Sequence, residues 1–333
     1  MTVATTPIFA SVTTVAHADW SVEARKRWMA VARRAGGIWR LAAPVPVGDP
    51  AAVLAGLHDP RGAVLFGIDA PIGLPRAYAE AHGITAAFPA FLRRLADRPS
   101  FFRVCAELAE VGPWRPFYPL RGRAGMTRAS HAAALGLNDA AALHRAVDRA
   151  TAERPAGAPP LWTLGANQSG KAALAAWHDV LLPALPLGAL RLWPFDGDLP
   201  DLLSCGITVM AETYPAEALR HLGLKLAGSK RRRADRVALA GGLRAAMARL
   251  AARPDAAMAA AVTDGFGADA AGEDRFDCTL GVLCALNVVA GNRPAFVPDD
   301  PWVRRWEGWV LGQTAPPLQD RISSAARASA CTP

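Results

Sequence analysis

Three short apolar segments that each end on an acidic residue constrain the fold more than any other feature of this chain. The segments are residues 11–18, 63–68 and 206–211, and the acids that follow them are Asp19, Asp69 and Glu212. Short runs rich in β-branched and other apolar residues predict buried strands. Because ligands bind open α/β sheets at the carboxyl ends of the strands, we expect the three carboxylates to converge at that edge.

The remaining segments predict a single α/β domain over residues 1–313. Residues 27–33 and 37–41 predict two strands around a Gly-Gly turn, and residues 275–289 predict a closing helix. Residues 76–193 are rich in alanine and leucine, which predicts a large helical insertion. The paired prolines and the Ser/Ala-rich end predict a flexible tail over residues 314–333.

Asp274 and Asp277 open the closing helix and bring the number of candidate acids to five. Carboxylates that converge repel one another and raise one another's pKa, and a divalent cation offsets that repulsion. Oxygen ligands suit Mg²⁺ or Mn²⁺, and a pair of such ions supports phosphoryl displacement. The alternative for Asp69 and Asp274 is an ordinary turn or helix cap.

Four short blocks resemble the signature blocks of an uncharacterised family of predicted ribonuclease H-like nucleases. They are residues 19–21 (DWS), 67–73 (GIDAPIG), 212–217 (ETYPAE) and 274–277 (DRFD), and the similarity in order and rough spacing runs from about residue 11 to residue 310. The resemblance implies a ribonuclease H-like mixed central sheet flanked by helices. It also implies metal ligands at Asp19 on the first strand, at Asp69 and Glu212 on later strands, and at Asp277 on the closing helix. The Arg-rich insertion departs from the compact members of that family.

Residues 165–171 (GANQSGK) match the Gly-x-x-x-x-Gly-Lys part of a phosphate-binding loop and follow a strand-like segment, residues 161–164. Backbone N–H groups at such a helix start cradle phosphate oxygens. Ala172 stands where a magnesium-binding Ser or Thr would be expected. We therefore expect Asn167, Gln168 and Lys171 to contact a phosphate of the substrate, with an ordinary helix start as the alternative.

The chain carries a formal net charge of +8, and a basic run at residues 229–236 (SKRRRADR) follows the Glu212 segment. Clustered basic side chains neutralise phosphates, so we expect Lys230 and Arg231 to bind phosphate beside the acids. The alternative for this run is a solvated helix face.

Five cysteines without a Cys-x-x-Cys pair argue against a disulfide framework or a zinc site and favour a cytoplasmic protein. No uncharged apolar stretch reaches the roughly 18 residues that a membrane-spanning helix needs, so we expect no membrane partner.

The leading prediction is therefore metal-dependent phosphodiester hydrolysis, by a nuclease or an enzyme acting on a small phosphoester, with Mg²⁺ or Mn²⁺ as cofactor. Asp19, Asp69, Glu212 and Asp277 are the predicted catalytic acids, and Asp274 is a fifth metal ligand. One alternative is a nucleotide-binding phosphoryl-transfer enzyme that uses the 165–171 loop. Another is a non-catalytic binding protein on the same fold.

Overall fold

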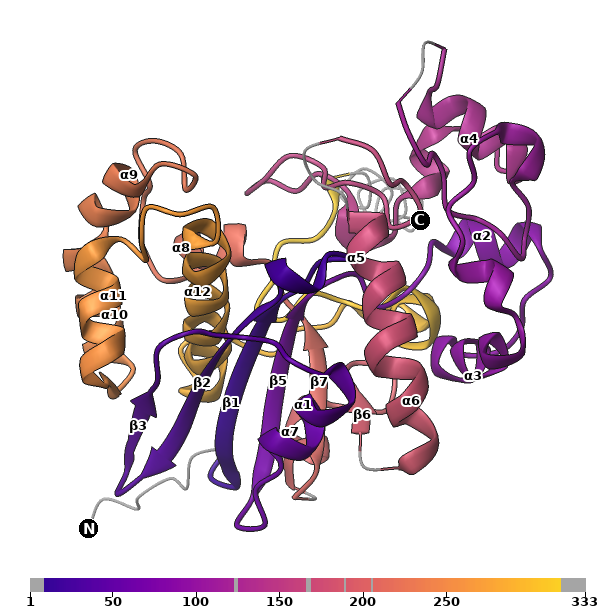
Figure 1. Cartoon of the computed structure of the whole chain (residues 1–333). Helices are drawn as coiled ribbons and strands as arrows, with labels where there is room; N and C mark the ends of the chain where they lie inside the picture. The colour runs from indigo at the N-terminus through magenta and orange to yellow at the C-terminus, as the bar shows by residue number, and fades with distance from the viewer. Residues whose placement is uncertain (1–8, 123–124, 166–168, 189, 205, 319–333) are drawn as a thin grey trace, which may run out of the picture.

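A mixed sheet of eight strands runs through the centre of the computed structural model, which describes residues 9–122, 125–165, 169–188, 190–204 and 206–318 (Figure 1). The strands are β1 (Val12–Asp19), β2 (Trp28–Ala35), β3 (Ile38–Leu41), β4 (Val45–Pro46), β5 (Ala63–Asp69), β6 (Leu190–Leu192), β7 (Thr208–Glu212) and β8 (Ala252–Pro254). Their order is β6-β7-β5-β1-β2-β3-β8, and β4 pairs with β2.

The sheet joins an antiparallel half to a parallel half at β1. β2 is antiparallel to both β1 and β3, and Gly36 and Gly37 connect β2 to β3 with φ angles of +56° and +81°. Those angles suit the tight turn between twisted strands that the Gly-Gly pair predicts. β5 is parallel to β1, and β7 is parallel to β5 and to β6. The carboxyl ends of β1, β5 and β7 therefore lie at one edge of the sheet.

Helices cover both faces of the sheet. They are α1 (Pro50–Leu57), α2 (Arg76–Ala81), α3 (Phe88–Arg94), α4 (Arg128–Ala134), α5 (Ser169–Ala176), α6 (Leu182–Ala184), α7 (Leu199–Ser204), α8 (Pro215–His221), α9 (Arg233–Ala238), α10 (Ala240–Arg249), α11 (Ala256–Asp264) and α12 (Gly272–Val289). One apolar core joins one face of the sheet to α7, α8, α10, α11 and α12, and a second joins the other face to α1, α2, α3, α5 and α6. The predicted α/β class, with a mixed central sheet flanked by helices, is confirmed.

Alternation along the strands decides which core each residue enters. The odd-numbered Val15, Leu65 and Val209 lie in the core of α12, whereas the even-numbered Ala16, Phe66 and Met210 lie in the core of α5. Successive side chains of a strand point to opposite faces, so this parity also assigns the residues at the strand ends.

The region between α2 and α5 consists of short helices joined by 3₁₀ turns and loops (Figure 1). The strand-like residues 161–164 form no strand of the sheet, because Trp162 makes only an isolated bridge to Tyr118. From Ser169, α5 continues through a π-helical turn, Trp177–Leu181, into α6.

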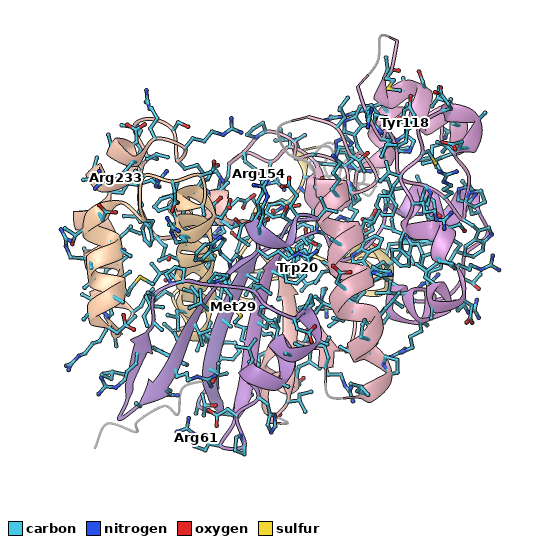
Figure 2. All side chains as sticks on the ribbon, viewed as in Figure 1. Trp20, Met29, Arg61, Tyr118, Arg154 and Arg233 are labelled. Atoms are coloured by element: carbon cyan, nitrogen blue, oxygen red, sulfur yellow. The ribbon has the colours of Figure 1, made fainter. Side chains whose placement is uncertain are left out.

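The two ends of the sheet are easily told apart by labelled side chains in Figure 2. Trp20 follows β1 at its carboxyl end, and Arg61 precedes β5 at the opposite end. Of the predicted tail, residues 314–318 are described: Pro317 bridges Thr151, and the Leu318 N–H donates to the Ala150 carbonyl at 2.9 Å. Residues 319–333 lie outside the described part. No helix among the described residues is long and apolar enough to cross a membrane.

Candidate functional site

Asp19 and Asp69 lie side by side at the carboxyl ends of β1 and β5. The two residues are direct partners in the parallel register, so their strands place them about 5 Å apart. Both are odd-numbered and share the face covered by α12. Within the described part of the chain, neither carboxylate takes part in a hydrogen bond or an ion pair, and both residues remain partly exposed. The strand register thus brings together two carboxylates that lack a direct partner in the described part of the chain.

α12 brings a third carboxylate, Asp277, to the same point. Gly281 of α12 lies so close to the buried His17 of β1 that a Cβ at this position would overlap the imidazole ring. Asp277 lies one helical turn before Gly281, about 6 Å along the helix, and Asp19 lies about 6.6 Å beyond His17 along the strand. The close contact between Gly281 and His17 therefore sets Asp277 over Asp19.

Lys230 is a cation that faces this cluster. Its ammonium contacts Oδ2 of Asp277 and lies 3.6 Å from Oε1 of Glu273. Asp277 is only 4% exposed, and its other oxygen, Oδ1, has no hydrogen-bond partner among the described residues. Arg236 holds the backbone of Lys230 in place by donating to its carbonyl at 2.5 Å. The cluster thus combines one paired and one free carboxylate oxygen on the same buried residue.

The electrostatics of the cluster show an excess of negative charge. Removal from water, together with Asp277, Asp69 and Asp274, raises the pKa of Asp19 well above its ordinary value. Burial raises the pKa of Asp69 to about 7, although Lys230 acts in the opposite direction. Burial likewise raises the pKa of Asp277 to about 6 against the influence of Lys230. One lysine therefore does not neutralise these acids.

Asp274 lies at the rim of the same group. It is in the first turn of α12, it is partly exposed, and burial followed by Glu273 raises its pKa. The acids that the structure brings together are therefore Asp19, Asp69, Asp274 and Asp277, with Glu273 beside them.

Glu212, by contrast, points to the other face of the sheet. In the parallel register Glu212 is the partner of Ile68, so Thr213 lies beside Asp69 on the face of the acidic cluster. Glu212 is fully buried and both its carboxylate oxygens accept from Arg145, each at 2.7 Å. The expected convergence of all three strand-end acids is therefore limited to two of them, because strand alternation sends the third away.

A buried network surrounds Arg145. Its guanidinium also donates to both oxygens of Asp148 at 2.9 Å, and Oε2 of Glu212 accepts from the backbone N–H of Ile72 at 2.7 Å. Ile72 belongs to the loop that follows Asp69. Glu307 accepts from the N–H of Ala146 at 3.0 Å and so ties the C-terminal segment to the same region. Glu212 thus holds the loop after Asp69 in place.

The predicted phosphate-binding loop is only partly within the described residues. Asn167 and Gln168 lie outside them, and Lys171 lies in the first turn of α5. A Cβ on Gly170 would come within 2.6 Å of the Trp162 carbonyl, so this glycine lets the helix start pack against the chain before it. The described part of the loop follows an isolated bridge rather than a sheet strand.

The basic run is divided among three different environments. Lys230 faces the acids, the side chain of Arg231 is 72% exposed with its Nε 3.6 Å from Glu273, and Arg236 is buried. Arg236 donates to the carbonyls of Gly265 and Gly267, each at 2.7 Å. The burial of Arg145 and Arg236 could not be predicted from the sequence, because an arginine that will be buried carries no local pattern that distinguishes it from a surface one.

The acids are oxygen donors of the kind that divalent cations such as Mg²⁺ prefer, and Oδ1 of buried Asp277 lacks, among the described residues, the hydrogen-bond partner that such an atom ordinarily has. No group of three or more His, Cys, Asp or Glu side chains within the described ranges already stands in a geometry that could hold a metal ion. Binding of a cation would therefore have to draw the carboxylates closer together.

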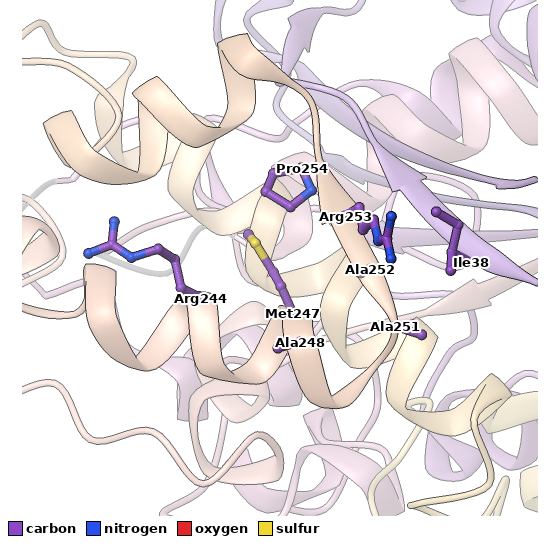
Figure 3. A pocket seen from close by; sticks show the side chains of 8 residues that line it. All are labelled: Ile38, Arg244, Met247, Ala248, Ala251, Ala252, Arg253 and Pro254. Atoms are coloured by element: carbon purple, nitrogen blue, oxygen red, sulfur yellow. The ribbon is translucent and has the colours of Figure 1, made fainter.

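Two pockets in the described part of the chain lie away from the acids. One, of about 540 Å³, is open to solvent, is bordered by the β3–β8 edge and α10 and is lined chiefly by apolar groups, with Arg244 and Arg253 at its sides (Figure 3). A second, of about 550 Å³, is lined by polar residues such as His221 and Asn287. None of the predicted site residues that the structure describes lines either pocket.

Comparison with known proteins adds no assignment to this geometry: no protein-family model matches the chain, and neither a curated protein nor a solved structure matches it significantly.

Proposed function

We propose that the chain is a Mg²⁺- or Mn²⁺-dependent hydrolase of phosphodiester bonds with a ribonuclease H-like arrangement. The observation that carries the proposal is the meeting of Asp19, Asp69 and Asp277 at one sheet edge, where a buried carboxylate oxygen of Asp277 has no partner within the described ranges. Adjacent carboxylates with raised pKa values are typical of functional sites.

Three placements support the ribonuclease H-like part of the proposal. The family resemblance implies an acid on the first strand, another on a later strand and a third on the closing helix. Asp19 is at the end of β1, Asp69 is at the end of β5, and Asp277 is on α12, which packs on both strands. Glu212 departs from the implied ligand set, since Arg145 engages both of its oxygens.

Each residue of the cluster has a distinct part in the proposed reaction. Asp19, Asp69 and Asp277 would hold the divalent cation, which would supply positive charge to the phosphoryl oxygens in the transition state. Lys230 lies beside these acids, and the exposed Arg231 extends the positive charge outward, where it can bind a neighbouring phosphate. Glu212 positions the loop after Asp69 through the Ile72 N–H.

Polyanions are the substrate class that the charge favours. The formal net charge of +8 promotes association with nucleic acid through neutralisation of phosphates and release of counterions. Nucleic acid is therefore the first substrate to test, followed by a small phosphodiester.

The test is a cleavage assay on single- and double-stranded DNA and RNA and on bis(p-nitrophenyl) phosphate, with Mg²⁺ or Mn²⁺ and with EDTA. We expect cation-dependent cleavage by the wild type and a loss of at least about 100-fold in Asp19→Asn. Asp97→Asn is the matched control, because Asp97 is exposed on the insertion and makes no described contact with the acids. Circular dichroism establishes that each variant is folded.

Three results would overturn the proposal. Cleavage that survives Asp19→Asn would remove the acids from the reaction. Nucleotide hydrolysis that depends on Lys171 but not on Asp19 would support phosphoryl transfer at the 165–171 loop instead. Indifference of every activity to both residues would support a non-catalytic binding protein.

A further inference from the structure

The turn that carries Trp114 is fixed by its neighbours, although this tryptophan is the most exposed of the ten in the chain. Gly112 and Arg115 exchange two backbone hydrogen bonds across the turn, at 3.1 and 3.3 Å. The buried Tyr78 donates its hydroxyl proton to the Pro113 carbonyl. Trp114 nevertheless keeps 37% of its surface exposed. The insertion thus presents a fixed aromatic ring to solvent, and such rings are enriched at surfaces that bind a partner.

The ring of Trp114 has both an aromatic support and a cation against it. It is nearly parallel to the ring of buried Phe91, at an angle of 21° with the centroids 6.0 Å apart. The guanidinium of Arg98 lies over the Trp114 ring, 3.9 Å from its centroid. Ser100 donates to the Trp114 carbonyl at 3.5 Å, so the chain on both sides of Arg98 packs on the turn. Aromatic rings and arginine planes are the platforms on which unpaired bases stack.

The same stretch of chain supplies further exposed arginines. Arg93 and Arg94 end α3, and Arg103 follows the 3₁₀ turn that comes after Arg98. All four arginines are exposed, and within the described ranges none of them pairs with an acid. Asp97 is the only acid from residue 93 to residue 103, so the stretch keeps an excess of three positive charges. Guanidinium groups gathered in this way bind phosphates.

The insertion as a whole carries most of the positive charge of the chain. Residues 76–193 hold fourteen basic and eight acidic residues, which accounts for +6 of the net charge of +8. Glu80 and Glu110 already pair with Arg76 and Arg115, so they do not offset the arginines around Trp114. Positive charge beside an exposed ring suits a polyanion that also has planar groups to stack.

We propose that single-stranded nucleic acid binds to the surface formed by Trp114, Arg93, Arg94, Arg98 and Arg103, the Trp114 surface. A base stacks on the Arg98–Trp114 pair, and the other arginines bind the phosphates on either side. The strand must be single, because the bases of a duplex already stack on one another. This inference goes beyond the proposed function, since it needs neither a metal ion nor cleavage.

The experiment is a fluorescence anisotropy titration with labelled single-stranded DNA and RNA and with the matching duplexes, all in EDTA. We expect Trp114→Ala to bind single strands at least about fivefold more weakly than the wild type, because one base loses its stacking partner. Trp114→Phe keeps an aromatic ring and should bind nearly as well as the wild type. The matched control is Phe296→Ala, which removes an aromatic side chain that is 36% exposed and lies outside the insertion. Circular dichroism establishes that each variant is folded.

The arginines provide a second measurement that leaves the tryptophan in place. Changing the exposed Arg93 and Arg94 together to Gln should reduce the slope of log affinity against log salt by about 1.4, since each phosphate contact with a single strand contributes about 0.7. The control changes two other exposed arginines, Arg40 of β3 and Arg253 of β8, to Gln and should leave the slope unchanged.

Three results would overturn the inference. One is a folded Trp114→Ala that binds single strands as tightly as the wild type. Another is an equal loss of affinity for single strands and duplexes, which would indicate phosphate contacts without stacking. Displacement of the strand by polyglutamate as readily as by an unlabelled oligonucleotide of equal charge would indicate an acidic protein as the partner.

A wild type that binds no single strand would also refute the inference. It would not decide the proposed hydrolase, because EDTA removes the cation on which that activity depends and the cleavage assay tests it separately.

Discussion

Two acidic regions lie at the same end of the sheet, on opposite faces, and differ in how their charge is compensated. Around Arg145, the carboxylates of Glu212 and Asp148 are fully buried and each receives two hydrogen bonds from one guanidinium. Around Asp19 and Asp69, no described hydrogen bond reaches the carboxylates, and Lys230 pairs with their neighbours Asp277 and Glu273 rather than with either of them.

The difference separates structural acids from candidate functional acids. A satisfied buried network fixes one conformation of the chain and leaves no ligand position open. A cluster of carboxylates with too little positive charge around it lowers the stability of the protein while no ligand is bound. Such a loss of stability is found at functional sites, where a bound ligand offsets it. The compensation of an acid is therefore a better guide to its role than its position at a strand end.

The largest change in stability should come from removing the cation of the buried Arg145 network. Arg145→Met leaves Glu212 and Asp148 as buried anions without their cation, and should lower the free energy of unfolding by about 3–5 kcal/mol. Urea denaturation followed by circular dichroism measures the change. Arg304→Met, which breaks an exposed pair with Asp198, should cost less than about 1 kcal/mol. Equal stability of the two variants would show that the Arg145 network is not a structural anchor.

A somewhat smaller loss should follow from pushing α12 away from the sheet. In Gly281→Ala the new methyl group meets the His17 ring, which is fully buried between Gly281 and Gly67. Overpacking of this kind should cost about 3 kcal/mol and shift Asp277 relative to Asp19. His17→Ala in the same chain removes the obstacle, so it should restore the spacing. If the double variant is no more stable than Gly281→Ala alone, contact with the His17 ring is not the reason for the loss of stability. Urea denaturation of both variants measures this.

Removing one member of the acidic cluster should stabilise the protein instead. With EDTA present, Asp69→Asn should raise the free energy of unfolding near pH 7.5 by about 1–2 kcal/mol, since it removes an ionised group that burial and Asp277 disfavour. Glu212→Gln, on the opposite face, should lower it, because Arg145 loses a charged partner. If both variants changed the free energy of unfolding in the same direction, the distinction between the two acidic regions would be wrong.

The dependence of the free energy of unfolding on pH provides a further test of the role of Asp69. The pKa of Asp69 is about 7 in the folded chain and near 4 in the unfolded one, so the folded chain binds more protons in between. The stability of the wild type should therefore be highest below pH 4 as far as this group is concerned, and should fall as the pH rises to 7. Asp69→Asn should show a weaker fall, and urea denaturation at pH 4, 5.5 and 7.5 measures it.

The strands and the closing helix could be predicted because each carries its own local pattern. The segment after residue 62 predicts β5 almost to the residue, and the Gly-Gly turn predicts the β2–β3 hairpin. β6 and β8 have only three residues each and form because they pair with a neighbouring strand, so the local sequence does not predict them. The segment 161–164 shows the reverse case, a strand-like sequence for which the sheet offers no partner.

The acidic cluster could be predicted in part, because strand ends converge by topology. What the sequence could not supply was the face on which each acid lies. β1, β5 and β7 are buried on both faces and therefore lack the apolar–polar alternation that would show their phase. Only the pairing of Glu212 with Ile68 reveals that it points away from Asp69, and only the fold brings Arg145 to it.

The smallest effect on stability should come from Arg231, a basic residue on the solvent side of the acidic cluster. Its side chain is 72% exposed, so Arg231→Gln should change the free energy of unfolding by less than about 0.5 kcal/mol. If nucleic acid binds beside the acids, the variant should bind it more weakly and lose about one unit from the slope of log affinity against log salt. Fluorescence anisotropy with labelled DNA and RNA at several salt concentrations measures this, with the exposed Arg40 of β3 changed to Gln as the control. Equal slopes for both variants would place the nucleic acid elsewhere, because a phosphate contact that Arg231 makes and Arg40 does not must appear as a difference between them.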